Sequence, residues 1–162
     1  MTTQNITPTV FALTTYEGRT ECPLDIFGAE VLVKLGSADS NGAAAVFRQH
    51  VPPMAGPPLH RHSREDEWFY VLAGEITLEI DGQRTALLEG GSAFSARGTA
   101  HTFQNFSNSV ATMLVMVTPG GFQRFLEELS SLNQELPAPD MVRSERLAQE
   151  YGIEALGPPL SY

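Results

Sequence analysis

Residues 60–67 read His-Arg-His-Ser-Arg-Glu-Asp-Glu, and together with His101 they supply a candidate set of metal ligands. His60 and His62 are two positions apart, so on a strand their side chains share one face. Three imidazoles and one carboxylate suit one divalent transition-metal ion (Fe, Ni, Mn, Zn, Cu or Co) better than Ca²⁺ or Mg²⁺, which prefer oxygen ligands. Three of the four histidines in the chain belong to this set, which is the first indication of function.

The carboxylate that completes the set is expected to be Glu67. It lies five residues after His62, and an odd offset would place it on the opposite face of a continuous strand. The polar run 63–66 must therefore bend or bulge the chain. Glu65 and Asp66 remain alternative ligands, because they belong to the same run.

Short β-favouring segments separated by turn signals fill the chain up to residue 118. These segments are 9–13, 29–33, 44–51, 68–72, 76–80, 84–88, 93–95, 101–106 and 111–117. Glycines and Asp-Gly or Asn-Gly pairs punctuate them. The proline-rich run 52–58 cannot donate a regular hydrogen-bond ladder, so it is expected to be a loop or a bulged edge. Many short strands at even spacing predict an all-β sandwich or barrel.

The hydrophobic period changes after residue 118. Apolar residues then recur at helical spacing, with polar residues between them: Phe122, Phe125, Leu126 and Leu129. Asp140 can cap a second helix that runs to about Tyr151, and both helices are expected to pack outside a sheet. The sequence thus predicts one domain, 1–162, with N-terminal strands in 1–40, a barrel core in 41–118 and a helical extension in 119–162.

Composition narrows the classes of partner and the location. The formal net charge of −9 opposes binding to nucleic acid and to anionic membranes, so a small molecule is the expected partner. We find no apolar run long enough to span a membrane and no secretory signal at the N-terminus. Cys22 is the only cysteine, which fits a cytoplasmic location. As a free cysteine it is expected to be a buried apolar residue.

Two spaced motifs resemble those of the cupin superfamily. The first motif, His-x-His, then Glu, then Gly, is matched by His60, His62, Glu67 and Gly74. The preceding Gly56 lies closer to His60 than the pattern specifies. The second motif is matched in spacing by Gly90, Gly98, His101 and Asn105, with Ala96 where proline is usual. We expect the missing proline to relax a turn rather than remove a ligand. Gly74 lies at the motif's spacing after Glu67, which favours Glu67 over Glu65 and Asp66 as the ligand.

Within this superfamily the chain is similar to small single-domain proteins of the quercetin 2,3-dioxygenase-like kind. The segments 57–62, 64–72, 118–122 and 151–160 carry that similarity. It implies a jelly-roll β-barrel of two antiparallel sheets that holds a metal through His60, His62, Glu67 and His101. It also implies that Glu67 takes a proton from a substrate hydroxyl, and that the protein forms a homodimer through its N-terminal strands.

Four residues outside the ligand set have expected roles. Phe69 and Phe103 share strand faces with Glu67 and His101, so they are candidates for an apolar substrate pocket above the metal. Asn105 is expected to hold a turn. His50 is expected to be an ordinary polar strand residue.

Two classes of function follow from the similarity and the ligand set. The first is a metal-dependent oxidoreductase, similar to a dioxygenase, acting on a small enol, diketone or phenolic compound. The alternative is a non-catalytic cupin that binds a small molecule with a structural metal, or a cupin isomerase. The fold alone does not decide between them.

Overall fold

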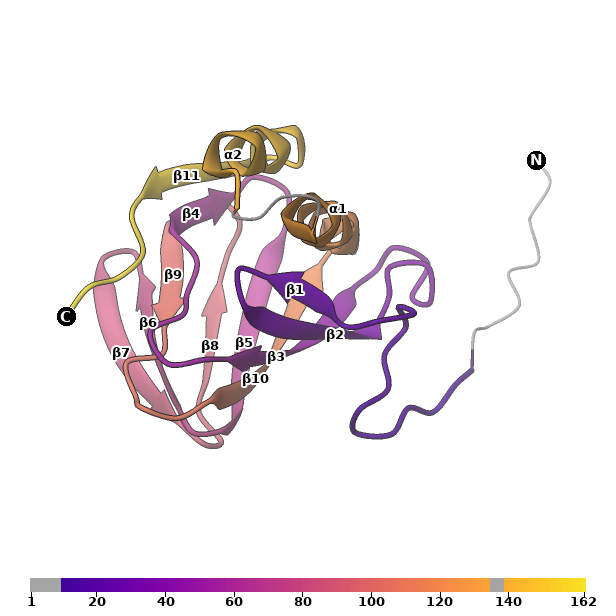
Figure 1. The fold of residues 1–162 in the computed structure, drawn as a ribbon, viewed down its shortest axis with the longest axis horizontal. Coiled ribbons are helices and arrows are strands. Elements are labelled where there is room, and N and C mark those ends of the chain that lie inside the picture. The colour runs from indigo at the N-terminus through magenta and orange to yellow at the C-terminus, as the bar shows by residue number, and fades with distance from the viewer. Residues whose placement is uncertain (1–9, 135–138) are drawn as a thin grey trace.

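The computed structural model describes residues 10–134 and 139–162, which form two facing antiparallel sheets with two helices beside them (Figure 1). One sheet has the order β1 (Leu24–Ile26), β2 (Ala29–Leu35), β3 (Ala45–Val51), β10 (Ala111–Thr118), β5 (Asp66–Ala73) and β8 (Ser92–Ser95). The other has the order β11 (Ile153–Gly157), β4 (Leu59–His62), β9 (His101–Gln104), β6 (Glu75–Ile80) and β7 (Gln83–Leu88). This is the predicted all-β jelly roll. No ladder between the described strands joins the two sheets into a closed ring.

The core lies between the two sheets, where alternate residues of each strand point inward. In β10 burial alternates strictly, and Met113, Val115 and Val117 are almost completely buried. The facing sheet contributes Ile76 and Leu78 from β6. Period-two burial of this kind is typical of strands that turn one face toward a core.

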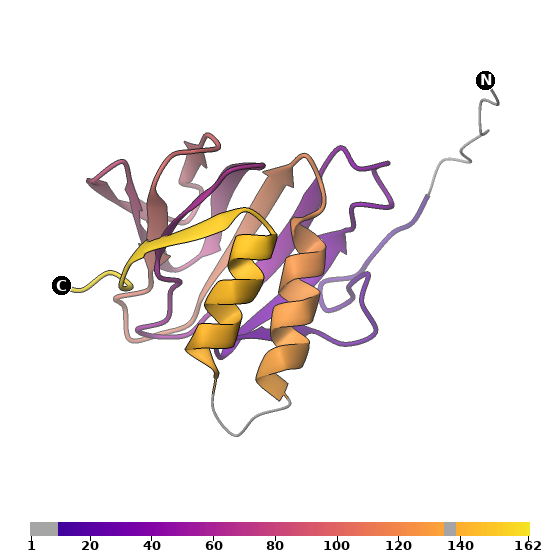
Figure 2. The same ribbon diagram turned by 90° about the horizontal axis from the view of Figure 1, so that it is seen from above.

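The helices α1 (Phe122–Gln134) and α2 (Met141–Glu150) confirm the predicted change of period. Asp140 caps α2, since its carboxylate accepts hydrogen bonds from the backbone N–H groups of Val142 and Arg143, each at 3.1 Å. Figure 2 shows the two helices side by side, outside the sheets. Of the described helices, none has the length and apolar character needed to cross a bilayer.

Two N-terminal expectations were wrong. Residues 10–13 form no strand, and Thr9 lies outside the described residues. The β-favouring side chains there have no neighbouring strand to pair with, because the described edge of the sheet is β1. Cys22 is exposed rather than buried, because it lies in a bend before β1 that turns away from the core.

The run 52–58 is the loop that the prolines predicted, and it lies along β9. The Met54 N–H donates to the Asn105 carbonyl at 2.7 Å, and the Asn105 N–H donates to the Ala55 carbonyl at 3.0 Å. A Cβ atom on Gly56 would lie 2.0 Å from the Phe103 carbonyl oxygen. Glycine is therefore needed here for close backbone approach, although its spacing in the motif is irregular.

Two strands, β1 and β11, are absent from the predicted segments. β11 pairs with β4 along the edge of its sheet, with Ile153 opposite His62 and Ala155 opposite His60. The strand that carries two candidate ligands is therefore central rather than at an edge, because β9 flanks it on the other side.

Candidate metal centre

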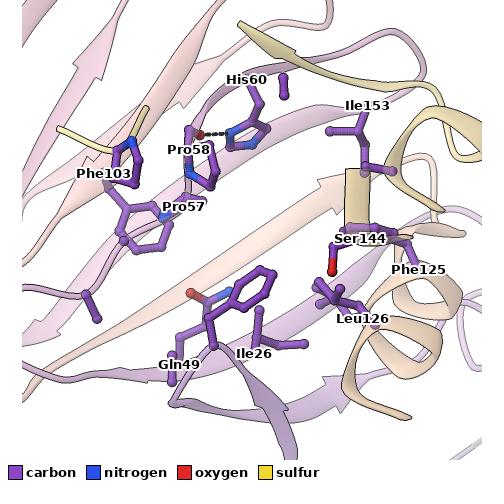
Figure 3. Close-up of a pocket in the computed structure, with 18 of the residues that line it drawn as sticks. Ile26, Gln49, Pro57, Pro58, His60, Phe103, Phe125, Leu126, Ser144 and Ile153 are labelled. Carbon is purple, nitrogen blue, oxygen red and sulfur yellow. Dashed lines mark hydrogen bonds between the residues drawn. The ribbon is translucent and has the colours of Figure 1, made fainter. Parts of the chain in front are cut away.

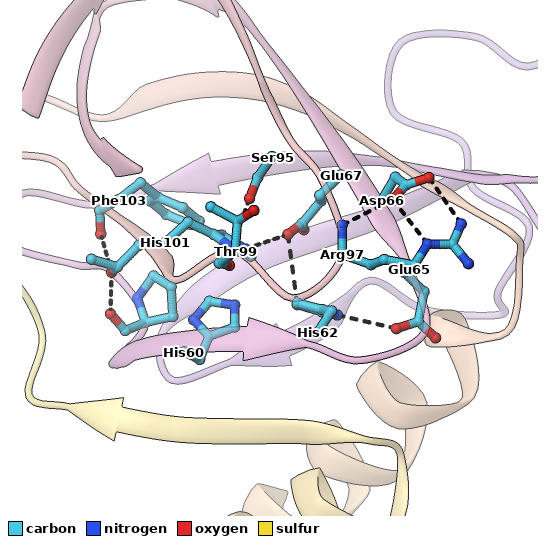
Figure 4. Close-up of polar contacts among 12 residues, drawn as sticks. His60, His62, Glu65, Asp66, Glu67, Ser95, Arg97, Thr99, His101 and Phe103 are labelled. Atoms are coloured by element: carbon cyan, nitrogen blue, oxygen red, sulfur yellow. Dashed lines mark hydrogen bonds and ion pairs between the residues drawn. The ribbon is translucent and has the colours of Figure 1, made fainter. Parts of the chain in front are cut away.

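The structure brings the four candidate ligands together from three strands and both sheets (Figure 4). His60 and His62 lie on β4, His101 lies opposite His60 on the neighbouring β9, and Glu67 faces them from β5 in the other sheet. One ligand atom from each residue lies within 4.8 Å of the other three. The four residues that the sequence predicted therefore form one group.

The bend at residues 63–65 carries the chain from one sheet to the other, as the odd offset predicted. The N–H and the hydroxyl of Ser63 both donate hydrogen bonds to the Gly152 carbonyl, each at 2.9 Å, and hold the bend in place. After this crossing Glu67 points inward with 6% of its surface exposed. The bend is thus what places the carboxylate opposite the imidazoles.

The two alternative carboxylates have other partners. Asp66 accepts from the Arg97 guanidinium at 2.9 and 3.0 Å and from the Arg97 N–H at 2.9 Å. These hydrogen bonds lower the pKa of Asp66 to about 2. Glu65 is buried and lies behind the histidines, with Oε2 3.3 Å from His62 Nδ1. Among these acidic residues, only Glu67 lies within the ligand group.

Each histidine has an oxygen acceptor at its Nδ1 atom. His60 Nδ1 lies 2.8 Å from the Pro58 carbonyl, and His62 Nδ1 lies 3.3 Å from Glu65. His101 Nδ1 lies 3.0 Å from both the Thr99 carbonyl and the Ser95 hydroxyl. Carbonyl and carboxylate oxygens only accept, so we assign the proton of each neutral ring to Nδ1. In His60 and His62 the lone pair of Nε2 then remains free to bind a metal, whereas His101 Nε2 faces Glu67 and must first give up the proton of that hydrogen bond.

The donor set fits a metal ion because one of its buried atoms has no other partner. His62 Nε2 is buried and makes no hydrogen bond to any described residue. It lies 3.6 Å from Glu67 Oε2, which in turn lies 2.7 Å from His101 Nε2. Buried polar atoms are almost always paired, and a cation bound between these atoms would satisfy His62.

The ionisation of the group suits cation binding. Burial and the neighbouring His101 and His62 lower the pKa of His60 to about 4, so His60 is neutral at pH 7. Burial alone would raise the pKa of Glu67, but the hydrogen bond from His101 and the nearby imidazoles lower it to about 2. Burial alone would lower the pKa of His101, but the contact with Glu67 outweighs burial and raises it. A metal that binds His101 Nε2 would displace the proton of its hydrogen bond with Glu67.

The turn before His101 is intact although Ala96 replaces the usual proline. The Thr99 N–H donates to the Ala96 carbonyl at 3.1 Å, and the Gly98 N–H donates to the His62 carbonyl at 2.6 Å. Arg97 adds its contact with Asp66. These bonds hold the turn against both strands, so it does not depend on proline.

A cavity of about 400 Å³ opens above the ligand group (Figure 3). Phe69 and Phe103 line it, as predicted, with ring centroids 6.4 Å apart. Helix α1 contributes its apolar face, and the Phe122 ring lies 4.9 Å from the His62 ring. The lining contains two carboxylates and, among the described residues, no lysine or arginine.

Sequence reasoning missed several cavity residues. It placed the helices outside the sheets, where they lie, but gave them no part in the site. α1 contributes Phe125, Leu126 and Leu129 to the lining, and α2 contributes Ser144. Gln49 also lines the cavity from β3, and its polar side chain on an inward-facing position was the one signal that could have identified it.

The two remaining polar residues have the expected roles. Asn105 is completely buried, and its amide donates to the carbonyls of Val51 and Ser109, each at 2.8 Å. It therefore holds a turn. His50 lies outside the ligand group, 3.0 Å from Glu30 on the neighbouring strand.

Comparison with known proteins identifies the family. Residues 47–117, which contain all four candidate ligands, match the family model described as the Cupin domain. This matched domain belongs to the cupin superfamily. A solved structure described as a sugar phosphate isomerase from this superfamily, from Silicibacter pomeroyi, shares 29% sequence identity with a TM-score of 0.51. The match covers 65% of this chain and 67% of that chain, and it supports the cupin fold.

Two curated relatives match about half of this chain. The oxalate-binding protein of Thermotoga maritima is 29% identical over 77 residues, which cover 48% of this chain and 64% of that protein. The tetracenomycin polyketide synthase protein TcmJ of Streptomyces glaucescens is 26% identical over 82 residues, which cover 49% of this chain and 55% of that protein. The matched region thus spans less than two thirds of either relative.

Removal of a single ligand should weaken metal binding strongly. We expect the purified protein to hold one equivalent of a divalent transition metal, and His60→Ala or His101→Ala to lower the affinity by more than about 100-fold. His50→Ala is the matched control, since it removes the one histidine outside the group. Metal content by mass spectrometry and titration calorimetry with Zn²⁺ measure the effect. Equal metal loss in the His50 variant would contradict the site.

Metal affinity should rise with pH. A metal binds neutral imidazole, so binding must release the proton of His101, whose pKa lies above the ordinary value of 6.5. Below that pKa we expect affinity to fall about tenfold per pH unit, and more steeply near pH 4, where His60 takes up a proton. Glu67 stays ionised until about pH 2. Calorimetry across this range should find these slopes; an affinity that is constant between about pH 5 and 6 would contradict this ionisation scheme.

Proposed function

We propose that this cupin binds one divalent transition-metal ion through His60, His62, Glu67 and His101 and is a dioxygenase-like oxidoreductase. Its substrate would be a small apolar enol, diketone or phenolic compound. The observation that carries this proposal is the placement of the ligand group in a largely apolar cavity of about 400 Å³. That volume is within the range of sites for ring-containing small molecules.

The charge of the cavity favours a neutral substrate body over an anionic one. Glu67 and Glu145 both line it, and no described lining residue is a lysine or arginine. A phosphate or a dicarboxylate would have no side-chain cation to pair with, and such groups normally recruit one. A sugar phosphate, the substrate class in the name of one similar structure, therefore fits poorly.

Aromatic side chains give the cavity the shape of a site for flat rings. Phe69 and Phe103 lie in an edge-to-face arrangement, and Phe122 lies beside the ligand group. Such rings pack well against an aromatic substrate. The similarity to a polyketide synthase protein agrees with this substrate class, because polyketides are rich in enols and phenols.

Each residue of the ligand group has a proposed task. The bound metal would supply a positive charge that lowers the pKa of a substrate hydroxyl and an open position for its oxygen. Glu67 is ionised at neutral pH and can accept that proton, while the Nδ1 hydrogen bonds hold the imidazoles in place. The apolar walls exclude water from the reacting groups.

A second candidate function is binding without catalysis. The observation that favours it is the similarity to a relative named for oxalate binding. In that case the metal would be structural or would hold a small ligand directly. The two candidates differ in whether oxygen is consumed.

Oxygen uptake tests the proposal. Apo protein is loaded separately with Fe²⁺, Mn²⁺, Co²⁺, Ni²⁺, Cu²⁺ or Zn²⁺ and mixed with flavonols, β-diketones or oxalate. We expect oxygen consumption equal to flavonol or diketone consumption with at least one redox-active metal and none with apo protein. Glu67→Gln should lower the rate by about 100-fold or more, and His50→Ala should leave it unchanged.

Other outcomes separate the candidates. Binding of the same compounds without oxygen consumption under every metal would contradict the oxidoreductase and support a binding protein. Tight binding of oxalate alone would contradict the proposed substrate class.

A further inference from the structure

The cavity has polar side chains away from the metal centre, and the proposed chemistry does not use them. Ser144 on α2 and Gln49 on β3 both line it, among mostly apolar neighbours (Figure 3). A polar side chain that lines an apolar cavity costs free energy unless it finds a partner.

Ser144 is the stronger of the two observations. It is the only buried residue that helix α2 contributes, with 6% of its surface exposed. Its hydroxyl is buried and makes no hydrogen bond to any described residue. An amphipathic helix normally buries apolar residues, so a buried unpartnered hydroxyl at this position has no packing explanation.

Gln49 faces the cavity from the opposite side. Its neighbours at the same strand parity, Phe47 and Val51, are completely buried, so the Gln49 side chain points inward. Gln49 itself is half-buried at the cavity wall. Figure 3 shows Gln49 and Ser144 on separate walls, both apart from His60.

The strand register places Gln49 far from the metal centre. Glu67 pairs with Val117 on β10, and Val117 pairs with Ala45 on β3. Gln49 lies four residues further along β3, which is roughly 13 Å at about 3.3 Å per residue. A group held there would belong to the opposite end of a ligand that reaches the metal.

We propose that Ser144 is a second polar anchor, which binds a hydroxyl or carbonyl oxygen at the end of the substrate remote from the metal, and that Gln49, on a separate wall, contacts another polar group of that end. This inference rests on the proposed function and narrows its substrate class. The cavity would select an elongated, flat, uncharged molecule with a metal-binding enol at one end and a neutral oxygen at the other. Helix α2, which lies outside the residues that match the Cupin domain, would then contribute to specificity through Ser144.

A pair of flavonols that differ by one hydroxyl tests the anchor. Kaempferol carries a hydroxyl on its pendant ring, and galangin lacks it. Zinc-loaded protein, which cannot turn the compounds over by redox chemistry, is titrated with each under nitrogen. We expect wild type to bind kaempferol more tightly, and Ser144→Ala to weaken kaempferol about two- to tenfold while changing galangin less than twofold.

Thermal unfolding and a control variant exclude a structural effect. Ser144→Ala removes a hydroxyl without a hydrogen bond, so the melting temperature should not fall. Ser131→Ala is the matched control, because Ser131 is exposed on α1 and outside the cavity. It should change neither affinity.

Two results would overturn the anchor: equal weakening of both flavonols by Ser144→Ala, or no effect on either. Failure of the proposed function has a different signature. In that case neither flavonol binds zinc-loaded wild type, or both bind equally well to His60→Ala; the anchor, which rests on that function, then falls with it.

Discussion

The orientation of three imidazole rings is the constraint on which the rest of the site depends. Pro58, Glu65 and Thr99 supply the oxygens that face the Nδ1 atoms of His60, His62 and His101. None of these oxygens can donate, so they fix which nitrogen carries the proton. Without them each ring could present either nitrogen, and the Nε2 lone pairs would not converge.

The fold supplies those oxygens from segments that are fixed by backbone contacts. The 52–58 loop delivers the Pro58 carbonyl and lies against β9 because Gly56 permits close approach. The turn at residues 96–99 delivers the Thr99 carbonyl and is bonded to the His62 carbonyl. The bend at 63–65 then brings Glu67 across to the same point. Backbone geometry and side-chain chemistry therefore act on one site.

Much of the centre could be predicted from the sequence because it depends on local spacing. Residues two apart on a strand share a face, and this parity placed His60 with His62 and Phe69 with Glu67. Turn residues and the change of hydrophobic period predicted most strands and both helices. Ala96 replaces the usual proline, yet His101 still lies in the ligand group, because backbone hydrogen bonds hold that turn.

The remainder depends on contacts between distant segments, which no local pattern encodes. β11 pairs with β4, which lies about 90 residues earlier in the chain, whereas residues 10–13 pair with no strand although β1 is the edge of its sheet. The apolar face of α1 looked like ordinary sheet packing, yet it forms a wall of the cavity. Cys22 is exposed because a bend carries it away from the core, which composition does not reveal.

The most direct test of the central claim is a crystal structure of the zinc-loaded protein with anomalous data at the zinc edge. The account predicts one ion about 2.0 to 2.2 Å from the Nε2 atoms of His60, His62 and His101 and from one oxygen of Glu67. The Nδ1 contacts with Pro58, Glu65 and Thr99 should remain in place. An ion bound through any Nδ1 atom, or held by residues other than these four, would contradict it.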